Sequence, residues 1–348
     1  SPAMANYIKQ LKIPGVYLRK ESKRYYPAGE IAAHLIGFTN VDDVGIEGVE
    51  QVYDQLLTGE SGETKYRKDA KGRRIEILAV EEPEPPQDLV LSIDHRIQAL
   101  AYKELKAAVN SFRATSGSVV VADLHSGEIL AMVNGPSYNP NNRAGTQVHK
   151  FRNRAITDVF EPGSTMKPLT LLSAMEFGVA TPDSIVDTSP GWMRLGGRRV
   201  SDIRNRGELS MAEILIHSSN MGTTKLAMEM PREFLLDKYF DVGFGEDTGT
   251  GLLGETMGMY EEKRRSEFEI ATLSWGYGLA ISPIQLAKLY SILGNGGVKR
   301  PFSIIKLDKK ELESEQIFTP ELTYDLLGML EQVVEKGASK AKVDGYRV

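Results

Sequence analysis

The spacing of hydrophobic residues after residue 88 predicts strands and helices in alternation. Apolar runs at 89–93, 118–123 and 128–134 indicate strands, and the last two flank the turn His125-Ser126-Gly127 as a hairpin. Helical spacing predicts helices at 95–112, 164–177, 210–216, 221–230, 283–294 and 320–334. This order favours an α+β fold, an antiparallel sheet flanked by helices, over repeated βαβ units. We expect the helices at 95–112 and 164–177 to cover the two faces of the hairpin.

The first part of the chain has shorter and more polar elements. A helix at 4–11, a strand at 15–18 and a hairpin of 64–68 with 74–78 are expected there. The acidic, proline-rich stretch 81–86 then interrupts any regular element, because proline lacks the backbone N–H that helices and central strands need. We therefore expect three parts: a small, non-catalytic, mixed α/β module at 1–80, a linker at 81–88, and a larger domain at 89–348.

Charge and composition narrow the classes of function. The net charge is −5, and acidic and basic residues are mixed along the chain. The sequence therefore has no basic segment that would indicate a nucleic-acid-binding surface. The 348 residues include no cysteine, and the five histidines have no ligand spacing, so we expect neither a metal site nor a cofactor. No apolar run is long enough to cross a bilayer.

The candidate chemistry lies at 161–168, Glu-Pro-Gly-Ser-Thr-Met-Lys-Pro. A Pro-Gly turn delivers Ser164 to the start of a helix, and Lys167 lies one turn further on the same face. A serine beside a neutral lysine can be a nucleophile beside its base, and burial lowers a lysine pKa. About one Ser-x-x-Lys match is expected by chance in a chain this long. Two further matches, Ser303 with Lys306 and Ser339 with Lys342, lack the turn and the helix start.

A second candidate, Ser218-Ser219-Asn220, falls between two predicted helices. Such a break can direct the side chains of Ser218 and Asn220 into a cleft, but Ser and Asn are also ordinary helix caps. Ser137-Tyr138-Asn139 has the same pattern in a loop. The glycine-spaced aromatic residues Trp275 and Tyr277, before the helix at 283–294, can either line a cleft or pack in a core.

Taken together, these segments resemble the class B penicillin-binding proteins. Residues 152–168 are similar to the first active-site motif of that family with its flank, and 217–220 to the second motif. Residues 24–29 and 45–50 resemble the family's N-terminal module, a pedestal or dimerisation module. The resemblance covers almost the whole chain and implies the fold of serine β-lactamases and penicillin-binding transpeptidases at 89–348.

The resemblance also implies an activity, septal peptidoglycan cross-linking by a serine D,D-transpeptidase through an acyl-enzyme. In that mechanism Ser164 attacks D-Ala-D-Ala, Lys167 takes its proton, and Ser218 relays a proton to the leaving amine. Asn220 orients Lys167 and binds the substrate amide. Glu161, Trp275 and Tyr277 are placed at the cleft by the resemblance alone, and β-lactams are expected to acylate Ser164.

One departure from the family pattern concerns its third motif, Lys-Thr/Ser-Gly, which supplies part of the oxyanion hole and is absent from this sequence. We therefore expect a fragment that is truncated at its C-terminus and impaired by itself. A single-pass anchor is expected upstream, which would place the domain at the periplasmic face of a bacterial inner membrane. Expected partners are peptidoglycan stem peptides, β-lactams, a membrane-embedded septal glycan polymerase and other division proteins.

Two alternatives remain open from the sequence. A β-lactamase or D,D-carboxypeptidase would use the same residues with water as the acceptor. A catalytically silent division scaffold would use residues 1–80 to bind partners.

Overall fold

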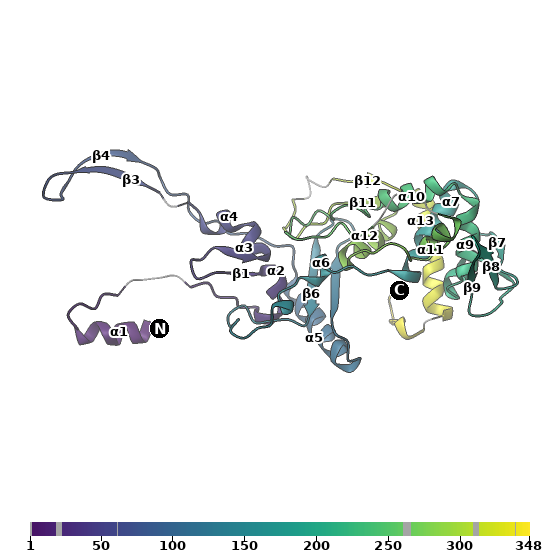
Figure 1. Cartoon of the computed structure of the whole chain (residues 1–348), viewed down its shortest axis with the longest axis horizontal. Helices are drawn as coiled ribbons and strands as arrows, with labels where there is room; N and C mark the ends of the chain where they lie inside the picture. Colours follow the sequence, from purple (N-terminus) through teal and green to yellow (C-terminus); the bar gives the residue numbers. More distant parts are fainter. Residues whose placement is uncertain (1, 19–22, 61, 260–265, 309–312, 338) are drawn as a thin grey trace.

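A computed structural model describes residues 2–18, 23–60, 62–259, 266–308, 313–337 and 339–348 of the chain. Helices and antiparallel pairs of strands are mixed along it, which confirms the predicted α+β class. The molecule is elongated, with a thin N-terminal part and a larger body that contains the later helices (Figure 1). Within the described residues, no helix is both long enough and apolar enough to cross a bilayer.

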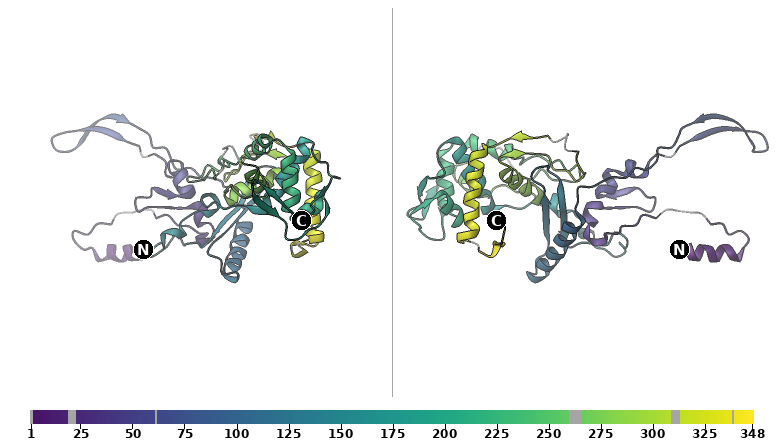
Figure 2. Two further views of the ribbon diagram at one scale, coloured as in Figure 1. Left: turned by 45° about the vertical axis from the view of Figure 1, so that its right-hand side comes forward. Right: turned by 180° about the vertical axis from the view of Figure 1, so that it is seen from behind.

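The N-terminal part consists of short elements, two of which project away from the body. The helix α1 and the hairpin of β3 and β4 extend as separate arms (Figure 2). The predicted helix and hairpin are confirmed, but 15–18 forms a turn and an extended segment instead of a strand. The elements of this part are α1 (Pro2–Leu11), α2 (Ala33–Ile36), β1 (Phe38–Thr39), β2 (Gly45–Glu47), α3 (Gly48–Val52), α4 (Asp54–Thr58), β3 (Thr64–Lys68) and β4 (Arg74–Val80).

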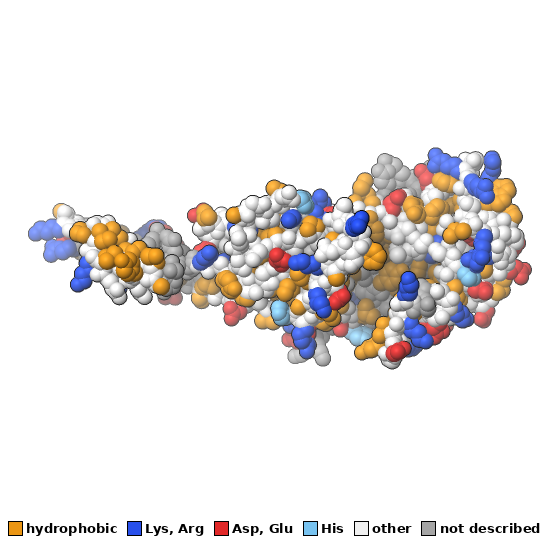
Figure 3. Space-filling model, turned by 90° about the horizontal axis from the view of Figure 1, so that it is seen from below, with side chains coloured by type: hydrophobic (Ala, Val, Ile, Leu, Met, Phe, Trp, Pro, Cys, Tyr) orange, Lys and Arg blue, Asp and Glu red, His pale blue; other side chains and the backbone are white. Residues whose placement is uncertain are grey.

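The projecting arms leave apolar side chains exposed. Met4, Tyr7 and Leu11 of α1 and Ile75 and Ile77 of β4 are all more than one-third exposed. Hydrophobic side chains gather at this thin end of the molecule when it is seen from below (Figure 3). An isolated two-stranded hairpin is marginally stable in water, so β3 and β4 depend on their own cross-strand pairs, such as Tyr66 with Ile77.

The proline-rich stretch 81–86 is exposed and extended, as a linker would be. It nevertheless continues the arm of β3 and β4, because Glu81 exchanges backbone hydrogen bonds with Glu63, and Glu84 with Glu60. The division of the chain at 81–88 stays a prediction.

The strands β5 (Gly117–Ala122) and β6 (Ile129–Gly135) form an antiparallel hairpin around residues 125–127, as predicted. One face is covered by α5 (His95–Ser111), whose Leu105 would contact a Cβ added at Gly117. On the other face, Val120 packs in one cluster with Ile284 of α12 (Pro283–Gly294). We expected the helix at 164–177 on that face, but α12 and the short helix α6 (Arg154–Thr157) pack there instead.

The side chains of α5 follow the predicted helical spacing only in part. Asp94 caps the helix by accepting hydrogen bonds from the backbone N–H groups of Arg96 and Ile97. Of the apolar face that the spacing predicts, Leu105 is buried, whereas Leu100 and Phe112 are exposed. The helix buries the polar Gln98 in addition.

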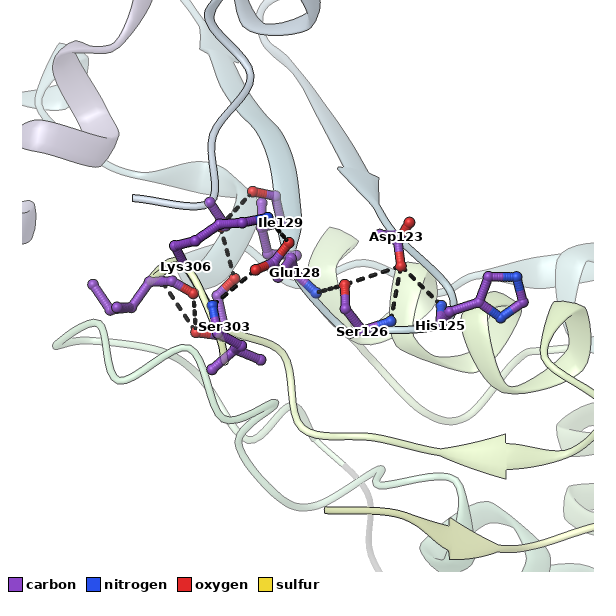
Figure 4. Close-up of polar contacts among 10 residues, drawn as sticks. Asp123, His125, Ser126, Glu128, Ile129, Ser303 and Lys306 are labelled. Atoms are coloured by element: carbon purple, nitrogen blue, oxygen red, sulfur yellow. Dashed lines mark hydrogen bonds and ion pairs between the residues drawn. The ribbon is translucent and has the colours of Figure 1, made fainter. Parts of the chain in front are cut away.

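A buried carboxylate fixes the turn of this hairpin to a distant segment (Figure 4). Glu128 accepts a hydrogen bond from the Lys306 ammonium at 2.6 Å and another from the backbone N–H of Leu307 at 2.8 Å. On the other side of the turn, Asp123 accepts hydrogen bonds from the backbone N–H groups of His125 and Ser126. The predicted strand at 89–93 lies along the same distant segment, but it forms a single bridge, Leu91 with Ile305, instead of a regular strand.

The second part of the body is mainly helical and surrounds α7 (Lys167–Phe177), in which nine residues are buried. Its core includes Leu169, Leu171 and Leu172 of α7. Gly178 ends α7 in the left-handed conformation, which glycine adopts readily. The other helices are α8 (Met211–Ile216), α9 (Asn220–Glu229), α10 (Arg232–Asp241), α11 (Glu267–Ser274) and α13 (Pro320–Gln332). Three short antiparallel pairs lie around them: β7 (Ile185–Asp187) with β10 (Glu208–Ser210), β8 (Trp192–Leu195) with β9 (Arg198–Ser201), and β11 (Val298–Lys299) with β12 (Glu315–Gln316).

Gln98 generates a prediction about stability. Its buried amide donates to the carbonyls of Ile31 and Met132 and accepts from the Met132 N–H, joining α5, β6 and the N-terminal part. Gln98→Leu would leave three backbone groups without partners, so we expect the free energy of unfolding to fall by about 2–4 kcal/mol. Chemical denaturation measures this change.

The matched control lies on the same helix. Lys103 is exposed, and Lys103→Ala should change stability by less than about 0.5 kcal/mol. Equal stability of the two variants would show that Gln98 is not the link described here.

Candidate active site

Ser164 is held at the start of the buried helix by pairing between two distant segments. Phe160 exchanges two backbone hydrogen bonds with Ile281, and the N–H of Gly163 donates to the carbonyl of Gly276 at 2.9 Å. Gly163–Met166 then forms one 3-10 turn, and α7 begins at Lys167. Ser164 is exposed at this turn. The sequence predicted the turn, although it is a 3-10 turn before the α-helix proper.

Lys167 lies under Ser164 and is 1% exposed. Its Nζ is 3.1 Å from Ser164 Oγ, 2.8 Å from Ser218 Oγ and 2.7 Å from the carbonyl oxygen of Ser218. Ser218 Oγ is also 3.0 Å from Ser164 Oγ. One amine and two hydroxyl groups thus form a closed triangle of hydrogen bonds, with a backbone carbonyl as the fourth group.

Burial controls the protonation of this amine. Removal from water lowers the pKa of Lys167 to about 8, whereas the carboxylate of Asp202 acts in the opposite direction. A lysine with this pKa is partly neutral near pH 7 and can accept a proton. Burial is therefore the leading cause of the lowered pKa, as the sequence predicts.

Ser218 lies in the break between α8 and α9 and has an unusual backbone conformation. Its φ of 52° is in the left-handed region, which is uncommon for a residue with a side chain. Both interpretations of the Ser-x-Asn pattern hold, but for different residues. Ser219 is the N-cap of α9 and accepts from the Gly222 N–H, whereas the Ser218 hydroxyl faces Lys167 and Ser164.

Asn220 is close to this group but not joined to the lysine. Its Nδ2 donates to the carbonyl of Ser201 in β9, at 3.4 Å. The hydrogen bond that we expected from Asn220 to Lys167 is not formed, because the carbonyl and hydroxyl of Ser218 occupy that amine instead.

The competing match of Ser303 with Lys306 does not assemble such a group. Lys306 pairs with Glu128, and the Ser303 hydroxyl donates to the carbonyl of Ile305, so no serine–lysine contact forms there. The side chain of Ser339 lies outside the described residues. In the loop, Tyr138 is buried and Ser137 donates to the carbonyl of Glu30.

The three residues placed by resemblance surround the same turn. Glu161 accepts a hydrogen bond from the N–H of Gly278 at 3.0 Å, and the Tyr277 ring is close to Gly163. Trp275 donates to the hydroxyl of Thr224 on α9 and contacts the Tyr277 ring edge-on, with centroids 5.1 Å apart. Glu161 is therefore bonded to the backbone, Tyr277 is exposed, and Trp275 is anchored to a neighbouring helix.

Several residues of the site could not be found from the sequence. Gly276 approaches Gly163 so closely that a Cβ would lie 2.0 Å from the Gly163 carbonyl oxygen. Tyr290 of α12 donates to the carbonyl of Thr165 from 125 residues away. Asp202 accepts hydrogen bonds from Ser219 and Met221. Gly276 lies between the aromatic residues Trp275 and Tyr277, but its contact with Gly163 cannot be predicted from that pattern. Tyr290 and Asp202 are not part of a local pattern, so only the fold reveals them.

The described residues contain no group of three or more His, Asp or Glu side chains that could hold a metal ion. The groups that converge on the triangle are an amine, hydroxyls, a backbone carbonyl and a backbone turn. This set is suited to nucleophilic chemistry on a carbonyl compound.

Comparison with known families identifies this arrangement. A family model described as the penicillin binding protein transpeptidase domain matches residues 117–348. The chain belongs to the penicillin-binding protein transpeptidase family. A second model, described as the penicillin-binding protein dimerisation domain, matches residues 2–91.

Curated relatives of this penicillin-binding protein cover its whole length. The chain is 48% identical to peptidoglycan D,D-transpeptidase FtsI of Escherichia coli K12, over 100% of this chain and 59% of that protein. It is 43% identical to the FtsI protein of Buchnera aphidicola subsp. Schizaphis graminum, over 100% of this chain and 61% of that protein. The chain therefore spans about three-fifths of the length of these relatives.

Solved structures support the same assignment. A peptidoglycan synthetase from Bifidobacterium adolescentis is 27% identical with a TM-score of 0.84, over 100% of this chain and 66% of that chain. The transpeptidase domain of Burkholderia pseudomallei penicillin-binding protein 3 is 37% identical with a TM-score of 0.68, over 74% of this chain and 75% of that one.

The contact of Gly163 with Gly276 generates a prediction for this penicillin-binding protein. Gly276 has a φ of 88°, and any side chain there would collide with the Gly163 backbone. Gly276→Ala should lower the melting temperature and displace the turn that carries Ser164. In the full-length protein that contains this sequence, covalent labelling by a fluorescent penicillin should fall by about tenfold or more.

Gly254→Ala is the matched control, since Gly254 has a φ of 82° and nothing within 4 Å of the added Cβ. It carries the cost of the left-handed conformation, about 1–2 kcal/mol, without the collision. Equal labelling by the two variants would contradict the role given to the glycine contact.

Proposed function

We propose that this chain carries the acylation centre of a peptidoglycan D,D-transpeptidase. The observation that carries the proposal is the closed triangle of Ser164, Lys167 and Ser218 around a buried amine. The FtsI relatives, which are named peptidoglycan D,D-transpeptidases, support the choice of reaction.

The triangle offers a complete path for one proton. A neutral Lys167 donates its two N–H bonds to the carbonyl and hydroxyl of Ser218, which leaves its lone pair for the hydrogen of the Ser164 hydroxyl. Ser164 Oγ then attacks the carbonyl of the D-Ala-D-Ala peptide bond, and its proton moves to Lys167. The resulting ammonium returns a proton through the Ser218 hydroxyl to the nitrogen of the departing D-alanine. An ester between Ser164 and the stem peptide remains.

The second half-reaction reverses these roles. An amine of another stem peptide attacks the ester, and its surplus proton travels through Ser218 to Lys167. Lys167 then returns a proton to Ser164 Oγ as the new peptide bond forms. The serine and the neutral lysine are both restored, so no group other than the two peptides is consumed.

The remaining site residues are assigned to binding the substrate. The N–H of Ser164 is one donor to the developing oxyanion, and the second would come from the family's Lys-Thr/Ser-Gly strand, which this sequence lacks. Losing one such donor costs about 10²–10³ in rate. Asn220 binds the substrate amide, and Glu161, Trp275 and Tyr277 shape the cleft on the opposite side of Ser164.

We also propose the substrates, the inhibitors, the location and the partners from the similarity to other penicillin-binding proteins. The substrates are D-Ala-D-Ala stem peptides, and β-lactams acylate Ser164 because they mimic that amide. A Mycobacterium tuberculosis penicillin-binding protein 3 has been solved in complex with aztreonam, and it is 28% identical with a TM-score of 0.78. The expected location is the periplasmic face of the inner membrane, with a septal glycan polymerase and other division proteins as partners.

The nucleophile can be tested directly. In the full-length protein, Ser164→Ala should abolish covalent labelling by a fluorescent penicillin, because the substitution removes the hydroxyl proposed to attack the β-lactam carbonyl. Ser303→Ala is the control, because Ser303 belongs to a competing Ser-x-x-Lys match whose lysine pairs with Glu128. Labelling that survives in the Ser164 variant would end this mechanism. A labelled adduct that hydrolyses rapidly would instead favour water as the acceptor.

The base can be tested through pH. A base acts only when it is unprotonated, so the acylation rate should rise with pH through the Lys167 pKa of about 8. About one-tenth of the lysine is neutral at pH 7 and about nine-tenths at pH 9, which predicts an increase of about tenfold between them.

Lys167→Arg should be nearly inactive across this range, because a guanidinium keeps the charge but cannot lose its proton there. The measurement is the second-order acylation rate by a penicillin between pH 6 and 10. A flat profile, or near-normal acylation by the arginine variant, would show that Lys167 supplies only positive charge.

A further inference from the structure

The carboxylate of Asp202 joins the β8–β9 hairpin to the start of α9. Its Oδ2 accepts from the Ser219 hydroxyl at 2.5 Å, and its Oδ1 accepts from the Met221 N–H at 3.0 Å. The Ser219 hydroxyl in turn accepts from the Gly222 N–H at 2.9 Å. The carboxylate and the capping serine together therefore satisfy two of the backbone donors that a helix N-terminus leaves open.

The backbone of Asp202 is itself held in place by β9 and its neighbours. It follows β9 directly, its N–H donates to the carbonyl of Gly191, and Val200 packs with Met221 and Ala271 in a buried cluster. The carboxylate thus fixes the start of α9 relative to β9, because it accepts hydrogen bonds from Ser219 and Met221, the residues on either side of Asn220.

Ser218 immediately precedes the residues that Asp202 holds. Its backbone is in the left-handed conformation at a φ of 52°, which costs about 1 kcal/mol or more for a residue with a Cβ. Such a conformation persists only where the surroundings impose it. The backbone bonds from Ser218 to Leu215 and from Ser219 to Ile214 fix one side of the turn, and the Asp202 carboxylate fixes the other.

We propose that Asp202 is a positioning residue of this active site, which holds the turn of Ser218 against Lys167. The inference rests on the proposed acylation function and adds a residue that does not touch the substrate. Its negative charge also suits the N-terminal end of α9, where the helix dipole favours an anion.

The electrostatic part of the role follows from the surroundings of Lys167. Burial lowers the pKa of that amine, and Asp202 is the charged group that raises it again. Among the described charged groups on elements packed around α7, many bond elsewhere. Lys225 of α9 donates to the carbonyl of Asp187, Glu213 of α8 pairs with Ser210, and Lys238 of α10 pairs with Asp241. The other charges on these helices are Glu229, Arg232, Glu233, Asp237, Glu321, Asp325 and Glu331.

Two substitutions separate the positional and electrostatic roles. Asp202→Asn keeps an acceptor for Met221 and can donate to the Ser219 hydroxyl, so it removes the charge while keeping the shape. We expect the midpoint of the acylation–pH profile to move down by about 0.5–1 unit, because the amine loses its neighbouring anion. Asp202→Ala removes both hydrogen bonds, and we expect the plateau acylation rate to fall by about 10–100-fold.

The matched control is another helix cap in the same region. Ser210 caps α8 in the same manner, accepting from the Glu213 N–H, but it contacts no residue of the triangle. Ser210→Ala should lower the melting temperature by a similar mechanism and leave both the midpoint and the plateau unchanged.

The decisive measurement is the penicillin acylation rate of the full-length protein and these variants between pH 6 and 10. A plateau rate for Asp202→Ala that stays at the wild-type value overturns the inference. If Asp202→Ala does not fold, Asp202→Asn decides, because it keeps the shape of the side chain: a plateau rate for Asp202→Asn that falls by about 10–100-fold then overturns the inference. A wild-type protein that is not labelled by penicillin would instead overturn the proposed function, so the two failures are distinguishable.

Discussion

The site depends on the removal of one amine from water. Lys167 lies at the start of a helix in which nine residues are buried, and the Ser218 carbonyl and two hydroxyl groups are its only polar neighbours within hydrogen-bonding distance among the described residues. An ammonium in such a place loses its hydration without gaining a paired carboxylate, so the neutral form is favoured. The Lys167 amine must also stay next to the exposed hydroxyl of Ser164. The surrounding backbone therefore has to hold Ser164 and Ser218 in place while it keeps water away from the lysine.

Three separate parts of the chain meet this requirement. The segment 160–163 is paired with 276–281, so the turn that carries Ser164 is fixed from one side by strand-like hydrogen bonds. The break between α8 and α9 fixes Ser218 from the other side. Glycine is needed at 276 because the two backbones approach more closely than a Cβ allows. The geometry of the site therefore depends on the close approach of these backbone segments as much as on the polar side chains.

The sequence predicted the parts of this structure that have local causes. The helix that begins at Ser164, the helix predicted at 210–216 and the hairpin around residues 125–127 all follow from neighbouring residues. The identity of the helix on the second face of the hairpin could not be predicted, because α12 and α7 have similar apolar content. Spacing predicted the contact of Lys167 with Ser164, but it could not predict the two contacts of Lys167 with Ser218. Asn220 was expected to bind the lysine, and the carbonyl of Ser218, which no sequence pattern marks, took that place.

The distance in sequence between the members of the site has a consequence for how the protein matures. Ser164 and Ser218 are 54 residues apart, and Glu161 and Gly278 are 117 apart. Contacts of this separation form late, since a long loop must close before they contribute any stability. In a partly folded chain Lys167 remains hydrated, and its pKa stays near the ordinary value of about 10.4. In the proposed mechanism, the serine therefore becomes reactive only when folding is complete, because only then is the neighbouring lysine buried and able to accept a proton.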